Sequence, residues 1–205
     1  MTAVTSVVLA GVGGQGTILA GKILTSGLMA AGYDVKMAEV HGMSQRGGSV
    51  SSQVRFGDAV ASPIIGEGMA DILVAFEEME AARYAKFLKP DGIAVVNMHR
   101  IPSMPVLSGA CTYPEGGVAA LQQKIRVVRL EAAKIAARAG HVKSANMVLL
   151  GALIEVLGLL QIDWQASIAQ TVKKEYAAVN IQAFEKGRQA AEKTTPPGEI
   201  RHISG

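Results

Sequence analysis

The sequence predicts an α/β fold: an open, mostly parallel sheet flanked by helices, followed by a helical C-terminal part. Strand-like and helix-like segments alternate over the first hundred residues, which is typical of parallel strands joined by right-handed crossovers. Apolar residues make up 49% of the 205 residues, enough for one large core. We therefore expect a single domain over residues 1–192, and a frayed tail over 193–205, where "TTPPGE" occurs.

Each expected element follows from a local pattern. A short buried strand is predicted at 6–10, where an apolar run stops at Gly11, and a helix is predicted at 15–30. Apolar or alternating stretches predict further strands at 33–40, 50–56, 72–76, 93–97 and 125–130. Helices are predicted at 77–88, 131–139, 144–159 and from 164 to about 189, and the prolines in 101–117 predict a loop.

The composition excludes several classes of protein. Aromatic residues are only 4% and the net charge is +3 without basic runs, so a base-stacking nucleic-acid binder is not expected. Cys111 is the only cysteine, which rules out an internal disulfide and a four-thiolate iron–sulfur cluster within this chain and favours a cytoplasmic location. No signal peptide is apparent, and Lys143 and Glu155 interrupt the most apolar window, so no membrane contact is expected.

A glycine-rich stretch, "VVLAGVGGQG", joins the first strand to the first helix. Its G-x-G-x-x-G spacing permits a tight turn, lets the backbone approach a pyrophosphate, and aims the free N–H groups of a helix start at an anion. The candidate cofactor-binding residues of this loop are Gly11, Gly13, Gly14, Gln15, Gly16 and Thr17. The alternative is that these glycines only pack the helix onto the strand.

A second loop, "HGMSQRGG", directly follows the second strand. Loops at the carboxyl ends of strands converge on one crevice in an open α/β sheet, so we expect the two loops to be neighbours. The candidate binding residues here are His41, Ser44, Gln45, Arg46, Gly47 and Gly48. Arg46 can hold a phosphate or carboxylate with two hydrogen bonds, or it can simply pair with Glu39 or with a partner's carboxylate. Both interpretations remain open.

At these loops the sequence resembles a known family. The stretches are "GVGGQGTILAGKIL", "EVHGMSQRGGSVSSQVRFG", "EGMADILVAFEEMEAARYAKFLKPDGIAVVN", "NMVLLGAL" and "NIQAFEKG". They are similar to the gamma-type subunit or domain of 2-oxoacid:ferredoxin oxidoreductases, over most of the chain to about residue 187. "VHGMSQRGGSV" looks most similar to the beta subunits of the indolepyruvate-acting members.

The resemblance implies a Rossmann-like subunit that assists chemistry performed by a partner. Family members decarboxylate a 2-oxoacid oxidatively, form an acyl-CoA and pass electrons to ferredoxin. Thiamine diphosphate, its Mg ion and the 4Fe-4S clusters are then expected on larger catalytic subunits, and coenzyme A is the ligand expected at the two loops. No residue of this chain is assigned a catalytic or metal-binding role.

Two other functions fit parts of the sequence. A free-standing NAD-binding oxidoreductase would use Glu39, which lies near the position of the ribose-binding acid in such folds, but no hydride-transfer motif is present. A regulatory module with an empty glycine loop is the third possibility.

The remaining polar residues are expected to be structural. We expect Cys111 to be a packed small residue, and Glu77, Glu78 and Glu80 to form a solvated first helical turn. Ser144 and Asn146 are expected as caps of a helix that is apolar nearly all round. Such a helix is either deeply buried in its own core or covered by another chain.

Overall fold

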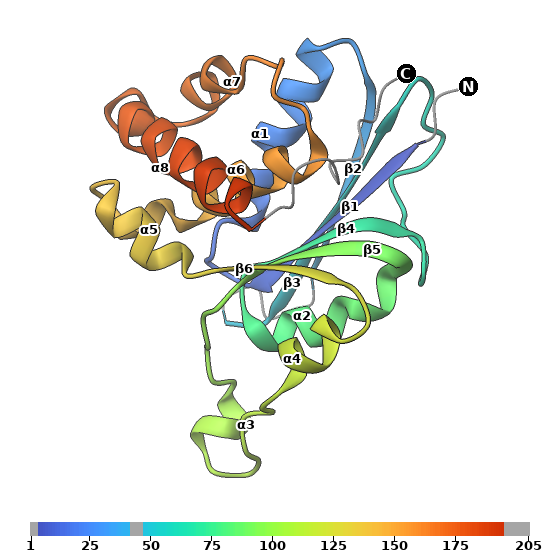
Figure 1. Cartoon of the computed structure of the whole chain (residues 1–205), viewed down its shortest axis with the longest axis vertical. Helices are drawn as coiled ribbons and strands as arrows, with labels where there is room; N and C mark the ends of the chain where they lie inside the picture. The colour runs from blue at the N-terminus through green and yellow to red at the C-terminus, as the bar shows by residue number, and fades with distance from the viewer. Residues whose placement is uncertain (1–3, 42–46, 195–205) are drawn as a thin grey trace.

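A computed structural model describes residues 4–41 and 47–194. Six strands form one sheet in the order β2-β3-β1-β4-β5-β6 (Figure 1). The strands are β1 (Thr5–Val12), β2 (Asp34–His41), β3 (Ser49–Gly57), β4 (Ala70–Ala75), β5 (Leu88–Asn97) and β6 (Arg126–Leu130). Their centres match the expected segments, and most of them extend beyond the apolar run that predicted them.

The sheet is mostly parallel, with one reversed strand. β1, β4, β5 and β6 pair in parallel, whereas β3 is antiparallel to both β1 and β2. β2 therefore runs in the same direction as β1 but lies one strand further away. The expected Rossmann-like class is confirmed, and the insertion of β3 between the first two strands is a feature that local patterns did not predict.

Helices cover both faces of the sheet. The helices are α1 (Thr17–Ala30), α2 (Glu78–Tyr84), α3 (Met104–Leu107), α4 (Gly117–Gln122), α5 (Ala132–Arg138), α6 (Ala145–Leu157), α7 (Trp164–Thr171) and α8 (Lys174–Glu192), with short 3-10 turns at Ala85–Phe87 and Val142–Ser144. α1 and α5 to α8 lie on one face, and α2 and α4 lie on the other (Figure 1). No helix in the described part of the chain is long and apolar enough to cross a bilayer.

The apolar helix α6 is buried within the core of this chain. All but one of its residues are buried, and it packs against α8. The crossing is close because glycines face the neighbouring backbone: a Cβ placed at Gly151 would lie 2.0 Å from the carbonyl oxygen of Phe184, and one at Gly187 would lie 2.0 Å from that of Val148. Of the two interpretations of this helix, burial in its own core is therefore the observed one.

The expected C-terminal helix is broken into two. α7 ends at Thr171 and α8 begins at Lys174, because Val172 and Lys173 adopt extended backbone conformations. The two helices have different neighbours, since α7 packs against α1 and α8 packs against α6. The expected loop 101–117 also contains the short helix α3. Cys111, which follows α3 in this segment, is exposed rather than packed as expected.

Candidate functional site

The two glycine-containing loops meet at the carboxyl edge of the sheet. The Gly13 N–H donates to the carbonyl oxygen of Gly48 at 2.9 Å, and the Gly47 N–H donates to that of Gly13 at 3.5 Å. β1 and β3 also pair up to Val12 and Ser49, directly beside the two loops. The expectation that these loops are neighbours is confirmed.

Gln15 holds the first loop in shape. Its Oε1 accepts from the Val12 N–H at 2.7 Å, and its Nε2 donates to the carbonyl oxygen of Phe76 at 2.8 Å. One side chain thus joins the end of β1 to the residue that follows β4. Both ends of this amide, a candidate ligand-binding group by sequence, therefore contact the backbone of the loop and its neighbour.

Three positions of the loop are occupied by glycine for different structural reasons. A Cβ at Gly11 would lie 2.9 Å from both Gln15 Oε1 and Phe76 Cβ, so close packing requires glycine there. Gly16 has a φ of 82° and would place a Cβ 2.5 Å from Asn146 Nδ2. Gly14 has a φ of 102°, and no atom of the described residues lies within 4 Å of its Cβ position, so these residues leave the space above the loop open.

The start of α1 is suited to an anion. Its first-turn N–H groups have no partner within the helix, no side chain of the described residues caps it, and its first turn carries no acidic residue. The helix dipole adds roughly half a positive charge at this end. Thr17, the first residue of the helix, is buried, and its Cγ2 would lie 3.0 Å from a Cβ placed at Gly11.

The second loop is only partly described. Gly47 and Gly48 lie against the first loop, and His41 is the last residue of β2. Ser44, Gln45, Arg46 and the side chain of His41 lie outside the described residues. Their binding roles stay predictions.

Buried amides extend the network across the sheet edge. Asn97, at the end of β5, donates from Nδ2 to the carbonyl oxygen of Phe76 at 3.1 Å and accepts the Ala132 N–H at 3.0 Å. Gln15 and Asn97 therefore share one acceptor, and the ends of β1, β4 and β5 are tied to the start of α5. An asparagine ending a strand that is followed by a loop was the available sequence signal, but its partners lie far away in the chain.

Asn146 joins the far helix to the glycine loop. It lies in the first turn of α6 and is buried, and its Nδ2 lies 3.5 Å from the carbonyl oxygen of Gly16. Its Oδ1 accepts the Met147 N–H at 3.0 Å, but Asn146 lies inside the helix. Ser144 is the N-cap residue and its side chain makes no capping hydrogen bond within the described residues, so the expected capping by these two side chains is wrong. The C-terminal helical part thus contacts the candidate site directly.

The solvated first turn expected at Glu77 and Glu80 is wrong. Glu77 is fully buried and caps α2, since its Oε2 accepts the N–H groups of Met79 at 2.6 Å and Glu80 at 3.0 Å. Glu80 is 2% exposed and accepts from the hydroxyl of Ser49 at 2.5 Å. β3 and the segment between β5 and α4 cover the start of α2. These carboxylates are therefore shielded from solvent by residues that are distant in sequence.

Glu80 anchors the residue that follows the second loop. Ser49 lies beside both Glu80 and the Tyr84 hydroxyl, which is 3.3 Å from its Oγ, while Arg83 Nε lies 3.2 Å from Glu80 Oε1. Burial raises the pKa of Glu80, partly offset by the hydrogen bond from Ser49 and by the charge of Arg83. The folded state therefore holds a proton on this carboxyl more tightly than the unfolded state does.

The raised pKa of Glu80 predicts a pH-dependent stability. Its stabilising contribution is complete below the unfolded pKa and is lost as pH rises through the folded pKa. The melting temperature of the wild type minus that of Glu80→Gln should therefore fall as pH rises from 4 to 8. Thermal unfolding at several pH values measures this difference, and Glu192→Gln, at an exposed carboxylate, is the control substitution. A difference that rises with pH would contradict the prediction.

Glu39 is not placed as an NAD-binding acid. It pairs with Ser52 on β3, and Ser52 in turn pairs with Leu9 on β1. Two strand spacings, about 10 Å, therefore separate Glu39 from β1. In folds that bind the ribose with this residue type, the second strand lies directly beside the first. The insertion of β3 removes that arrangement here.

Comparison with known proteins identifies the family. The sequence profile described as "Pyruvate ferredoxin/flavodoxin oxidoreductase" matches residues 6–190. The chain belongs to this family.

Relatives and solved structures agree with this assignment. The chain is 40% identical over 197 residues to "Indolepyruvate oxidoreductase subunit IorB" of Pyrococcus horikoshii, covering 91% of this chain and 95% of that protein. It is 31% identical over 192 residues to "2-oxoglutarate synthase subunit KorC" of Methanothermobacter marburgensis, covering 88% and 93%. The "keto/oxoacid ferredoxin oxidoreductase, gamma subunit" of Geobacter sulfurreducens shares the fold, with a TM-score of 0.69, 22% identity, and coverage of 92% and 99%. The chain is a subunit of a 2-oxoacid:ferredoxin oxidoreductase complex.

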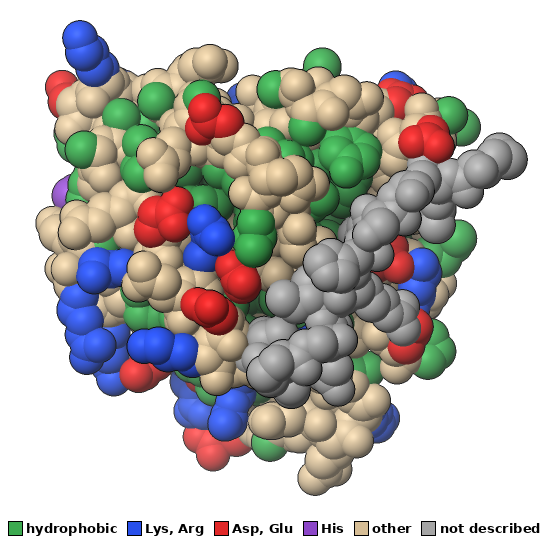
Figure 2. Space-filling view, turned by 45° about the horizontal axis from the view of Figure 1, so that its top comes forward, with side chains coloured by type: hydrophobic (Ala, Val, Ile, Leu, Met, Phe, Trp, Pro, Cys, Tyr) green, Lys and Arg blue, Asp and Glu red, His purple; other side chains and the backbone are tan. Residues whose placement is uncertain are grey.

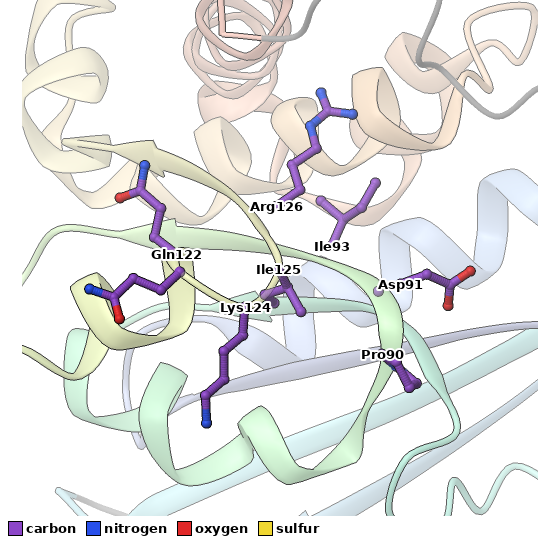
Figure 3. A pocket seen from close by; sticks show the side chains of 9 residues that line it. Pro90, Asp91, Ile93, Gln122, Lys124, Ile125 and Arg126 are labelled. Carbon is purple, nitrogen blue, oxygen red and sulfur yellow. The ribbon is translucent and has the colours of Figure 1, made fainter.

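In the described part of this oxidoreductase subunit, several surface hollows lie away from the glycine loop. One of about 530 Å³ lies between the starts of β5 and β6, and Figure 3 shows Lys124 and Arg126 beside it, pointing away from each other. A hollow of about 670 Å³ lies between α2 and α4 and is lined by residues such as Ala82 and Leu121. A third, of about 490 Å³, lies between α5 and α8, and Lys and Arg gather on this side of the molecule at the left of Figure 2.

A metal centre is not found in the described part of this family member. Across residues 4–41 and 47–194, no three His, Cys, Asp or Glu side chains lie close enough to hold a metal ion. The single cysteine, Cys111, is exposed on the segment between β5 and α4.

Proposed function

We propose that this chain is the small, non-catalytic subunit of a thiamine-diphosphate-dependent 2-oxoacid:ferredoxin oxidoreductase that forms an acyl-CoA. Thiamine diphosphate, Mg and the 4Fe-4S clusters reside on larger catalytic subunits, and ferredoxin is reached through the complex. Relatives that are named as subunits of indolepyruvate oxidoreductase and 2-oxoglutarate synthase support this assignment. A single cysteine supports a reducing location such as the cytoplasm.

The carboxyl edge of the sheet holds a phosphate of coenzyme A. The observation that supports this role is the uncapped start of α1 beneath a loop left bare by Gly14, with the second loop hydrogen-bonded alongside. The N–H groups of Gly14, Gly16 and Thr17 are the proposed donors, and Arg46 is the proposed cation. When bound, the thiol of coenzyme A accepts the acyl group, while the residues of this chain bind and orient the phosphates.

Indolepyruvate or a related arylpyruvate is the proposed substrate of the complex. Relatives named for indolepyruvate oxidoreductase are 35–40% identical to this chain, and those named for 2-oxoglutarate synthase are 30–32% identical. A solved "2-oxoglutarate:ferredoxin oxidoreductase" of Magnetococcus marinus has 2-oxoglutarate, coenzyme A and succinyl-CoA bound. This chain matches a third of that longer chain, with a TM-score of 0.75 and 21% identity.

Reconstitution tests this function. The isolated chain is expected to show no oxidation of 2-oxoacids, and activity should appear when it is co-purified with its large subunit and given a panel of 2-oxoacids, CoA and ferredoxin. Titration of the complex with CoA and with NADH should show binding of CoA only. Turnover by the isolated chain, or NADH binding that Glu39→Ala abolishes, would contradict the proposal.

A further inference from the structure

The segment between β5 and α4 forms a projection from the carboxyl edge of the sheet. Here the projection means residues 101–114, which include α3 and extend well away from the body of the molecule (Figure 1). Backbone hydrogen bonds order its tip. The Leu107 N–H donates to the carbonyl oxygen of Ser103, and the Ala110 N–H donates to that of Pro105, each at 2.9 Å.

One buried carboxylate clamps both ends of the projection. Glu77 Oε1 accepts the Ile101 N–H at 3.1 Å and the hydroxyl of Tyr113, while its Oε2 caps α2. The Tyr113 oxygen also accepts the Met79 N–H at 3.1 Å. Burial and the bond to Glu77 raise the pKa of the Tyr113 phenol, so this clamp keeps its proton at physiological pH.

Ion pairs reinforce the base of the projection from outside. Arg100 contacts Glu78 and Glu115, each at 3.2 Å, and its guanidinium lies 5.3 Å from the ring centre of Tyr113. The buried Glu77 on the inside and the Arg100 ion pairs on the outside thus fix the position of the projection relative to α2. A segment held in this way loses little conformational entropy when it binds.

The surface of the projection is apolar and uncharged. No charged residue lies between Arg100 and Glu115, although charged residues make up 18% of the chain. Met104 and Leu107 are 74% and 67% exposed, among the most exposed large apolar side chains of the described residues. Exposed apolar side chains on an ordered element are typical of a protein interface.

A lipid surface does not fit this chemistry. Binding to an anionic membrane needs cations beside the apolar residues, and Arg100, the cation at the base, is engaged with two carboxylates. A protein recess that is itself apolar and uncharged matches the projection without leaving a buried charge unpaired.

We propose that the projection docks into an apolar recess on the large catalytic subunit of the complex. The naming of this partner rests on the proposed function. Glu77 follows Phe76, whose carbonyl oxygen also holds Gln15 and Asn97, so the clamp and the glycine loop share one framework. A partner that seats the projection therefore contacts a segment tied to the same framework as the glycine loop. The Magnetococcus marinus relative, in which this fold is a third of a longer chain, has further polypeptide joined to it.

Assembly with the large subunit tests the proposal. Met104→Asp combined with Leu107→Asp should weaken binding of the large subunit at least tenfold, measured by biolayer interferometry with the purified subunits. The matched control is Ile64→Asp with Met69→Asp, at apolar side chains 59% and 54% exposed before β4, which should bind as the wild type does. Equal melting temperatures of both free variants exclude unfolding as the cause.

Cys111 supplies a measurement that needs no substitution. It is the only cysteine and is exposed on the projection, so N-ethylmaleimide labelling followed by mass spectrometry reports its accessibility. Labelling is expected to slow at least tenfold in the complex compared with the free chain. An unchanged rate, or wild-type affinity of the double variant, would overturn the docking proposal while leaving the complex itself established.

Two other outcomes point elsewhere. If the wild-type chain binds no large subunit at all, the proposed function fails, and the docking proposal fails with it. If the free chain sediments as a dimer and the double variant as a monomer, with the complex unaffected, the projection is an interface between copies of this chain. That result would also overturn the proposal.

Discussion

Gly187→Ala is expected to lower the free energy of unfolding by about 3 kcal/mol, the upper range for overpacking a core. The added methyl would lie 2.0 Å from the carbonyl oxygen of Val148, which is backbone and cannot rotate away, so α6 and α8 must separate. For a domain of this size the melting temperature should fall by roughly 10 °C. Urea unfolding followed by circular dichroism measures the change.

A matched pair of variants tests the cause. Gly151→Ala, whose Cβ would meet the carbonyl oxygen of Phe184, should cost a similar amount. The double variant should cost less than the sum, because one separation of the helices accommodates both methyl groups. Gly66→Ala, whose nearest neighbour is the flexible Met69 side chain at 3.2 Å, is the control with little effect. Additive losses would show that the two sites do not share one crossing.

Gly14→Asp is expected to raise the KM for coenzyme A about a hundredfold in the assembled complex, a change of about 2.8 kcal/mol. The carboxylate would lie in the open space over the uncapped start of α1, where the phosphate is proposed to bind. Like-charge contact at a binding site costs several kcal/mol, which supports an effect of this size. Steady-state kinetics with varied coenzyme A measures it.

Gly14→Ala is the matched control for this variant. Both substitutions place a side chain on a residue with a φ of 102°, so both strain the backbone. Only the aspartate adds negative charge, and the ratio of the two KM values isolates its contribution. Equal KM values for the two variants would contradict an anion site at this loop.

Much of the fold was predictable because local patterns agree with it. Alternating apolar segments located all six strands, and Gly11 marked the end of the first one. Errors arose where a distant neighbour decided the outcome. The break between Thr171 and Lys174 reflects packing of α7 and α8 on different helices. Neither Gly nor Pro occurs at this break, so the sequence did not indicate it.

The candidate site was predictable in outline but not in its internal bonds. The spacing of the glycines and the order of the strands brought the two loops together, as expected. The role of Gln15 as a brace depends on Phe76, which lies 61 residues away. Similarly, Asn97 reaches Ala132 across 35 residues, and no local pattern specifies such partners.

By itself, the sequence determined the fold class, the family and the glycine loop, because each depends on residue type and short-range spacing. Only the tertiary structure decided that β3 lies between β1 and β2, that Glu77 and Glu80 are buried, and that Cys111 is exposed. These features depend on which segments cover one another. Burial and hydrogen-bond partners of a side chain are properties of contacts between distant residues, which the local pattern around that side chain does not contain.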